Sequence, residues 1–190
     1  YKRQIWDWSK EYRHIAPKTH TGLSGIAIES VDGGIIEQVT FNNISMEGII
    51  TPIFICLTHR RMNQHSGQSG IIRNLLFSNI TAKAEGIIPT LIAGTPTGRI
   101  TDITLRDITV EHAGGEKAMT KSLPENLKGY PENRMYGKEN PAGGLYIRHA
   151  DNILIENFHI RQRNTDERPS IFLDDATDIH IEKLQSTGSI

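Results

Sequence analysis

In four short runs of this sequence, aliphatic residues alternate with side chains that are charged or aromatic or, at one place, a thiol. The alternating side chains are Glu29, Phe54, Cys56, Tyr146, Arg148, Phe172 and Asp174. A guanidinium binds a carboxylate through two parallel hydrogen bonds, and carboxylates accept hydrogen bonds from hydroxyl groups. With aromatic rings that can stack on a ligand, these residue types suit a molecule rich in hydroxyls and carboxylates, such as a sugar acid. The alternative is a solvated sheet face on which Glu29 pairs with a nearby arginine.

Two loops carry further groups that could bind an anionic ligand. The stretch 58–65 contains His59, Arg60 and Arg61. A surface loop that only keeps the protein in solution explains this stretch equally well. The stretch 114–143 is rich in Lys, Glu, Pro and Gly, and loops of this length are usually either functional or disordered. Its possible ligand contacts are Lys121, Lys128 and Arg134.

A repeated pattern predicts the elements that position these side chains. Five segments align without gaps, with apolar residues at the fourth, sixth and ninth places, and Asn or Asp at the eighth place in four of them. The segments are 36–46, 72–82, 100–110, 150–160 and 176–186. The apolar fourth and sixth places have the period of a strand, and the polar eighth place marks a bend. Stacked side chains at such bends can hydrogen-bond along a ladder.

Each aligned segment follows one further β-rich run. These leading runs are 25–30, 53–57, 90–94, 145–148 and 171–174. Repeats at periods of about 20–50 residues are typical of solenoids. The pattern therefore predicts an all-β protein, a right-handed parallel β-helix (a single-stranded solenoid) of about five or six coils. A leucine-rich or other solenoid is the rival, but no segment resembles a helix of about 10 residues or more.

The chain is expected to form one domain, residues 1–190, in four parts. Residues 1–24 form an end segment, in which Trp6, Trp8 and Tyr12 cap the solenoid. The remaining parts are the coils at 25–112, a long loop insertion at 113–143 and the final coils at 144–190.

Composition excludes several other classes of protein. Lys and Arg number 21 against 22 Asp and Glu, so the net charge of −1 gives no reason to expect a nucleic-acid or membrane-surface partner. No apolar run approaches the roughly 20 residues of a membrane-spanning helix. A single cysteine excludes an internal disulfide, and the histidines lack metal-ligand spacing. We therefore predict no metal and no cofactor.

Several stretches resemble glycoside hydrolase family 28, the polygalacturonases, and in particular a bacterial branch of it. The matching stretches are 25–34, 39–46, 52–55, 130–132, 135–137 and 144–149, and the likeness extends over about residues 20–190. The resemblance implies a parallel β-helix that is secreted or periplasmic and degrades pectin. It also implies a pectic or other acidic polysaccharide as partner, bound along the outer face of the sheet formed by the leading runs.

The resemblance does not identify catalytic residues in this chain. Family members invert the anomeric carbon with carboxyls about 6.5–9.5 Å apart. They take these groups from Asn-x-Asp, Asp-Asp and Gly-His-Gly motifs on successive coils, followed by Arg-x-Lys. Ala27 and Glu29 occupy the Arg-x-Lys places, and residues 1–24 contain neither Asn-x-Asp nor Gly-His-Gly. The pair Asp174–Asp175 lies in the last coil and is expected to be two exposed acids that end a strand.

Two classes of function remain open at this point. The chain could be a fragment of a pectin-degrading hydrolase that lacks the catalytic acids and supplies only the downstream groove. It could instead be a non-catalytic module that binds acidic glycans or has a structural role. The second possibility is favoured because Ala27 and Glu29 stand where the family has two basic residues. A neutral or branched pectic substrate would explain the same loss, whereas pectate lyase chemistry needs a calcium-binding acidic cluster that is not evident. The predicted substrate-binding residues are Glu29, His59, Arg60, Tyr146, Arg148 and Asp174.

Overall fold

The computed structural model describes residues 21–59, 70–125, 131–137 and 139–187. Within these ranges the protein is all-β, as predicted, and its one helix is the short 3-10 turn η2 (Asn133–Tyr136). The strands are β1 (Gly22–Ser30), β2 (Ile35–Leu57), β3 (Ile71–Ala84), β4 (Thr90–Ala93), β5 (Ile100–Gly114), β6 (Leu145–Asn164) and β7 (Ile171–Ser186).

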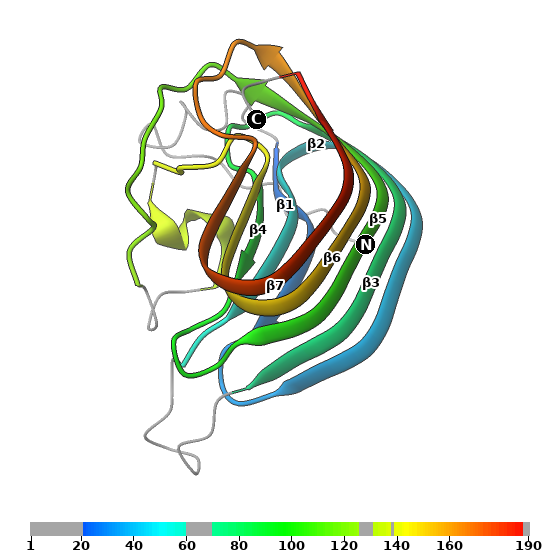
Figure 1. Cartoon of the computed structure of the whole chain (residues 1–190), viewed down its shortest axis with the longest axis vertical. Helices are drawn as coiled ribbons and strands as arrows, with labels where there is room; N and C mark the ends of the chain where they lie inside the picture. Colours follow the sequence, from blue (N-terminus) through cyan, green and yellow to red (C-terminus); the bar gives the residue numbers. More distant parts are fainter. Residues whose placement is uncertain (1–20, 60–69, 126–130, 138, 188–190) are drawn as a thin grey trace.

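Every pairing between these strands is parallel. The order is β1-β2-β3-β5-β6-β4, and a further pairing of β2 with β4 closes a ring of five strands, while β7 pairs with β6. The ring closes because β2 and β6 are long: the first part of β2 pairs with β3 and its last part with β4. Figure 1 shows the long strands side by side, bent around a common interior.

The gap-free alignment of the five segments is confirmed by the strand register. Ile36 pairs with Ile72, and Ala150 pairs with both Ile100 and Ala176. The leading runs pair with one another in the same way, so that Ile147 lies between Ile92 and Leu173. Equivalent residues of successive repeats therefore stack in columns across the strands.

The predicted bend at the eighth place is also confirmed. All five eighth-place residues have left-handed backbone, with φ between 50° and 59°. They are Asn43, Asn79, Asp107, Asn157 and Lys183. Asn and Asp tolerate this conformation better than other residues with a Cβ. The Asn79 amide donates a hydrogen bond to Asn43, and the Asn157 amide donates one to Asp107 at 2.6 Å, which is the expected ladder.

The aligned segments also bend at their third place, which the sequence analysis did not predict. The residues there have φ between 53° and 60° and are Gln38, Asn74, Asp102, Asn152 and Asp178. The Asn152 amide donates a hydrogen bond to Asp102 at 2.6 Å. Two polar columns per segment therefore turn the chain around the apolar interior, in which Phe41 stacks on Phe77 with ring centroids 4.9 Å apart.

A buried ion pair fastens the connections between strands. Arg168 and Asp166 are almost fully buried, with distances of 2.9 Å from Arg168 Nε to Asp166 Oδ1 and 2.8 Å from Nη2 to Oδ2. Arg168 Nη1 also donates to the carbonyl oxygens of Ile87 and Asn140. The pair thus joins the β3–β4 connection, the insertion and the β6–β7 connection.

We expect Asp166→Asn to lower the free energy of unfolding by about 3–5 kcal/mol, because it leaves the buried Arg168 charge without its partner. The matched control is Glu37→Gln at the exposed Arg73–Glu37 pair, where the distance is 2.7 Å. An exposed pair contributes about 1 kcal/mol or less. Urea unfolding of the three proteins measures the difference, and equal losses in both variants would contradict the anchoring role of Asp166.

His112 is a second buried polar group of the interior. It is fully buried, and neither ring nitrogen has a hydrogen-bond partner among the described residues. Burial, together with the positive charge of Arg168, lowers the pKa of His112 to about 3. In the unfolded chain the imidazole has its ordinary pKa of about 6.5. Between these two values the unfolded chain binds the additional proton, so stability falls as the pH is lowered.

We expect His112→Phe to reduce this acid sensitivity. Between pH 6.5 and 4.5 the free energy of unfolding of the unmodified protein should fall by about 2–3 kcal/mol more than that of the variant, because the variant has no imidazole to protonate at position 112. His180→Gln, on the exposed face of β7, serves as the control and should keep the pH dependence of the unmodified protein. Urea unfolding at several pH values checks this, and parallel curves for all three proteins would disprove the role of His112.

Candidate functional site

The outer face of the leading runs is covered by the insertion between β5 and β6. Phe54, Cys56 and Tyr146 point away from the main interior, as the alternation predicted, but each is completely buried. Leu123 and Tyr136 of the insertion pack against them and form a second apolar core. In Figure 1 the segment with η2 lies beside β4, on the side away from β3 and β5. The expected open groove is therefore closed over these strands, because their outward side chains are too apolar to remain exposed.

Specific contacts hold the insertion in place. The Asn133 side-chain amide donates to the carbonyl oxygen of Leu23 and to Thr51 Oγ1, at 2.9 Å from the latter. Cys56 Sγ lies 3.7 Å from the Tyr136 hydroxyl. Burial raises the pKa of the Cys56 thiol to about 12, so this cysteine acts as a small buried side chain and not as a reactive thiol.

A group of charged side chains lies where the insertion meets β6 and β7. We call it the polar cluster, and its members are Arg99, Glu125, Arg148, His149, Asp151, Asp174 and Asp175. The buried guanidinium of Arg148 donates to Glu125 and to the carbonyl oxygen of Leu123, the latter at 2.8 Å, and its Nε lies 3.6 Å from Asp174 Oδ2. Arg148 was expected to bind a uronate from an exposed surface, but the guanidinium is buried, and its Nη1 and Nη2 already donate to groups of the protein itself.

His149 connects two carboxylates within the polar cluster. Its backbone is left-handed, with φ 44°, and its side chain is buried. Nδ1 lies 2.6 Å from Asp175 Oδ2, and Nε2 lies 2.7 Å from Glu125 Oε1. Because both nitrogens face carboxylate oxygens, the protonated ring can donate to both.

Asp175 and Asp151 share Arg99. The guanidinium of Arg99 donates to Asp175 Oδ2 at 2.7 Å and to both oxygens of Asp151, at 2.5 and 2.7 Å. Hydrogen bonds from His149 and Arg99 lower the pKa of Asp175, and those from Arg99 lower the pKa of Asp151. These carboxyls are therefore held ionised, which suits charge pairing and not proton donation.

Asp174 is held by the leading run of the preceding repeat. The Tyr146 hydroxyl donates to Asp174 Oδ2 at 2.7 Å, and burial together with this hydrogen bond raises the pKa of Tyr146. The Tyr146 ring stacks on Phe172, with ring centroids 5.8 Å apart, and has no exposed surface on which a sugar could stack. Asp174 and Asp175 were expected to be exposed acids that end a strand, but they lie within β7 and bond to side chains outside it. Of the two, Asp175 is exposed as expected and Asp174 is only partly exposed.

Glu29 lies outside the polar cluster, on β1. It is half-buried, and burial together with the negative charge of Glu132 raises its pKa. Among the carboxyls of the described ranges whose pKa clearly departs from the ordinary value, Glu29 is the one that is raised. A carboxyl that keeps its proton to higher pH is suited to general acid chemistry.

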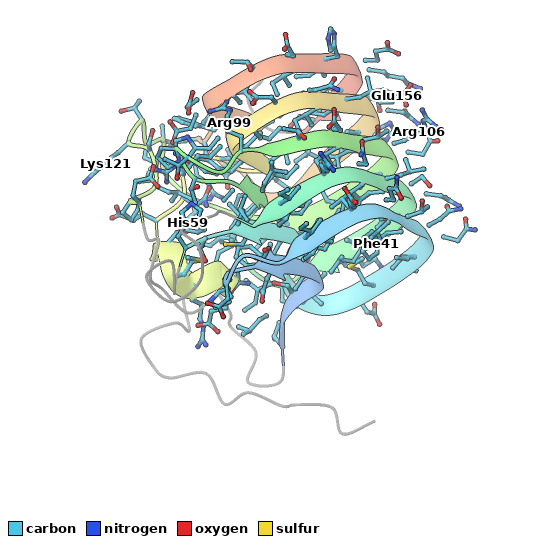
Figure 2. All side chains as sticks on the ribbon, turned by 90° about the horizontal axis from the view of Figure 1, so that it is seen from below. Phe41, His59, Arg99, Arg106, Lys121 and Glu156 are labelled. Atoms are coloured by element: carbon cyan, nitrogen blue, oxygen red, sulfur yellow. The ribbon has the colours of Figure 1, made fainter. Side chains whose placement is uncertain are left out.

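The remaining predicted contacts are dispersed. His59 is buried, and its Nε2 lies 2.9 Å from Thr95 Oγ1 and 3.1 Å from Thr97 Oγ1. Arg60 and Arg61 lie outside the described residues. Lys121 lines a hollow of about 310 Å³ within the insertion, together with Tyr136. Figure 2 shows His59, Arg99 and Lys121 on one side of the stacked strands, with Arg106 and Glu156 on the opposite side.

The structure thus brings together Tyr146, Arg148 and Asp174 of the predicted set, while Glu29 and His59 make other contacts. Sequence reasoning missed Arg99, Glu125, His149 and Asp151 of the polar cluster. The signal for His149 was its place directly before an aligned segment, where Asp175 stands one repeat later. Glu125 had no signal of this kind, because it belongs to the unrepeated insertion.

One Asn-x-Asp triplet does occur in the chain, at Asn164–Asp166. Asp166 is the buried partner of Arg168, so here the triplet has a structural role. Within the described residues, no group of three or more His, Cys, Asp or Glu side chains is arranged to hold a metal ion. The described part of the chain also has no helix that is long and apolar enough to cross a membrane.

Comparison of the chain with protein-family models, curated proteins and solved structures gave no match. The function is therefore argued from the residues and their geometry.

We expect Glu125→Gln to loosen the insertion, because it removes the charge that Arg148 and His149 share. Hydrogen bonds to charged groups contribute about 1.5–3 kcal/mol, so the opening equilibrium should rise about tenfold or more. Cys56 is the chain's only cysteine and lies beneath the insertion, so its rate of reaction with a thiol reagent reports this opening.

The control for this labelling is Glu167→Gln, at the exposed Lys117–Glu167 pair. Its labelling rate should match that of the unmodified protein. An unchanged rate in Glu125→Gln would mean that the polar cluster does not hold the insertion closed.

Proposed function

We propose that this chain forms part of a pectin-degrading glycoside hydrolase of the polygalacturonase type, folded as a right-handed parallel β-helix. The observation that carries the proposal is the register of the repeats. The five aligned segments pair in parallel, each with its neighbours in the series, and their equivalent places bend in the same left-handed conformation. Such pairing between sequence neighbours is what stacked coils require.

The closed ring of strands agrees with a solenoid. In this proposal the leading runs form one face of the stack and the aligned segments form the next. β2 and β6 pass from one face to the other without interruption, so their pairings connect both faces. The ring is then a consequence of continuous strands that turn corners, and each repeat corresponds to one coil.

We further propose that substrate approaches the leading-run face at β1. Ala27 is exposed and Glu29 half-buried on this strand, whereas Phe54 and Cys56 on the adjacent strand lie beneath the insertion. A polysaccharide bound over β1 would therefore end against the insertion, and this favours hydrolysis near an end of the polysaccharide. Glu29 is the carboxyl that we place in contact with the substrate, either as proton donor or as acceptor of a hydroxyl hydrogen bond.

A non-catalytic glycan-binding or structural module is the second candidate. The observation in its favour is that the carboxyls of the polar cluster are bonded to Arg, His or Tyr side chains of the protein. Inverting hydrolysis needs one carboxyl to donate a proton and another to activate water. Carboxyls held in ion pairs serve stability better than proton transfer.

A reducing-sugar assay on polygalacturonate and rhamnogalacturonan tests the proposal, with the 190-residue chain compared with the longest product of its gene. We expect hydrolysis by the longer protein, and a loss of at least tenfold in kcat/KM in its Glu29→Gln variant. Glu47→Gln, an exposed carboxyl on β2, is the matched control and should keep full activity. Binding without hydrolysis by the longest product would support the glycan-binding module and refute the hydrolase.

A further inference from the structure

The outer surface of the aligned segments contains a hollow that the proposed function does not use. It has a volume of about 790 Å³ and extends across β2, β3, β5 and β6. It lies at the third-place bend, which makes the surface concave between the third and fifth places of each segment. Its lining residues do not belong to the leading runs, the insertion or the polar cluster, and Glu29 is not among them.

The lining of the hollow repeats from strand to strand. One column consists of the third-place residues Gln38, Asn74, Asp102 and Asn152. The side-chain amides of Gln38 and Asn74 make no hydrogen bond to the described part of the protein, so they are free to bind a ligand. The second column, at the fifth place, alternates between hydroxyl and aliphatic side chains in the order Thr40, Leu76, Thr104, Leu154.

The spacing of these columns points to an extended polymer that crosses the strands. Neighbouring strands lie about 4.7–4.9 Å apart, which is close to the length of one pyranose unit in an extended glycan. The Thr–Leu alternation repeats every second strand. In a (1→4)-β-linked glycan each unit is turned over relative to the last, so the groups that one unit presents to a surface recur on every second unit, which is the same two-unit period.

The charge of the hollow favours a neutral polymer. Asp102 is its one ionisable side chain, and it already accepts hydrogen bonds from Asn152 and Thr101. The lining contains no Lys, Arg or His, so nothing in the hollow compensates the carboxylates of an acidic polysaccharide. Amide, hydroxyl and aliphatic groups in a concave surface are the groups that recognise neutral sugars.

We infer that this hollow is a binding site for a neutral, extended (1→4)-β-linked polysaccharide. The polymer runs across the strands, with its hydroxyls toward the amides of Gln38 and Asn74 and its apolar ring faces toward Leu76 and Leu154. The site does not depend on the proposed hydrolase function, because it shares no residue with the leading-run face.

Titration calorimetry of the full chain with cellohexaose tests this inference. We expect saturable binding that is weakened at least tenfold by Thr104→Trp, which fills the middle of the hollow. The matched control is Thr109→Trp, which changes a half-buried outward threonine of the same strand beyond the eighth-place bend, and should keep the affinity of the unmodified chain. Circular dichroism shows whether both variants keep their strands.

If Thr104→Trp does not fold, Leu154→Ser replaces it, since this substitution removes an apolar contact without filling space. No binding of cellohexaose to the unmodified chain, or equal affinity in the decisive variant and the control, overturns the inference. Hexagalacturonate is titrated in parallel. Its binding or failure to bind bears on the proposed function alone, so the two conclusions can fail separately.

Discussion

The left-handed bend is the constraint on which the rest of this structure depends. Each long strand must turn at least twice around the interior without losing its parallel pairing, and the turning residue must adopt a positive φ. Asn and Asp tolerate that conformation and can also bond to the same column of the next strand. Because the turns stay in register, the apolar fourth, sixth and ninth places stay in register too, and the continuous interior follows.

The face formed by the leading runs meets a different requirement. Its outward side chains are mainly apolar, so they need a cover, and the insertion provides one. The cover is fixed by charge at its edges, where Arg148 and His149 bind Glu125, and by the buried Arg168–Asp166 pair at its base. Ionic groups here position an irregular segment that has no strand pairing of its own, which explains why they concentrate where the repeat is interrupted.

The sequence predicted the repeated part of this structure well and the unrepeated part poorly. The eighth-place bend at Asn43 and the alternation of Ile26 with Ala27 could be read directly, because five copies of one pattern reinforce each other. The third-place bends were not predicted, although Asn or Asp stands at this place too in four of the five segments, with Gln38 in the fifth. The burial of Tyr146 and Arg148 could not be predicted, because it depends on how residues 115–125, 131–137 and 139–143 fold over them. A segment without a repeat has no second copy to confirm its contacts.

Lys183, at the eighth place of the last aligned segment, makes the two sides of the stack of strands unequal. Lys183 adopts the same bend as the four Asn and Asp residues before it, but an ammonium group has no acceptor and cannot continue their ladder. A charged side chain on an edge strand also discourages another strand from pairing there. The eighth-place residue of a repeat inserted between β2 and β6 would have Asn or Asp on the strands at both sides. The eighth-place residue of a strand paired with β7 would have Lys183 as its neighbour. Among the described strands, the column of eighth-place residues therefore favours a further repeat between β2 and β6 over one that pairs with β7.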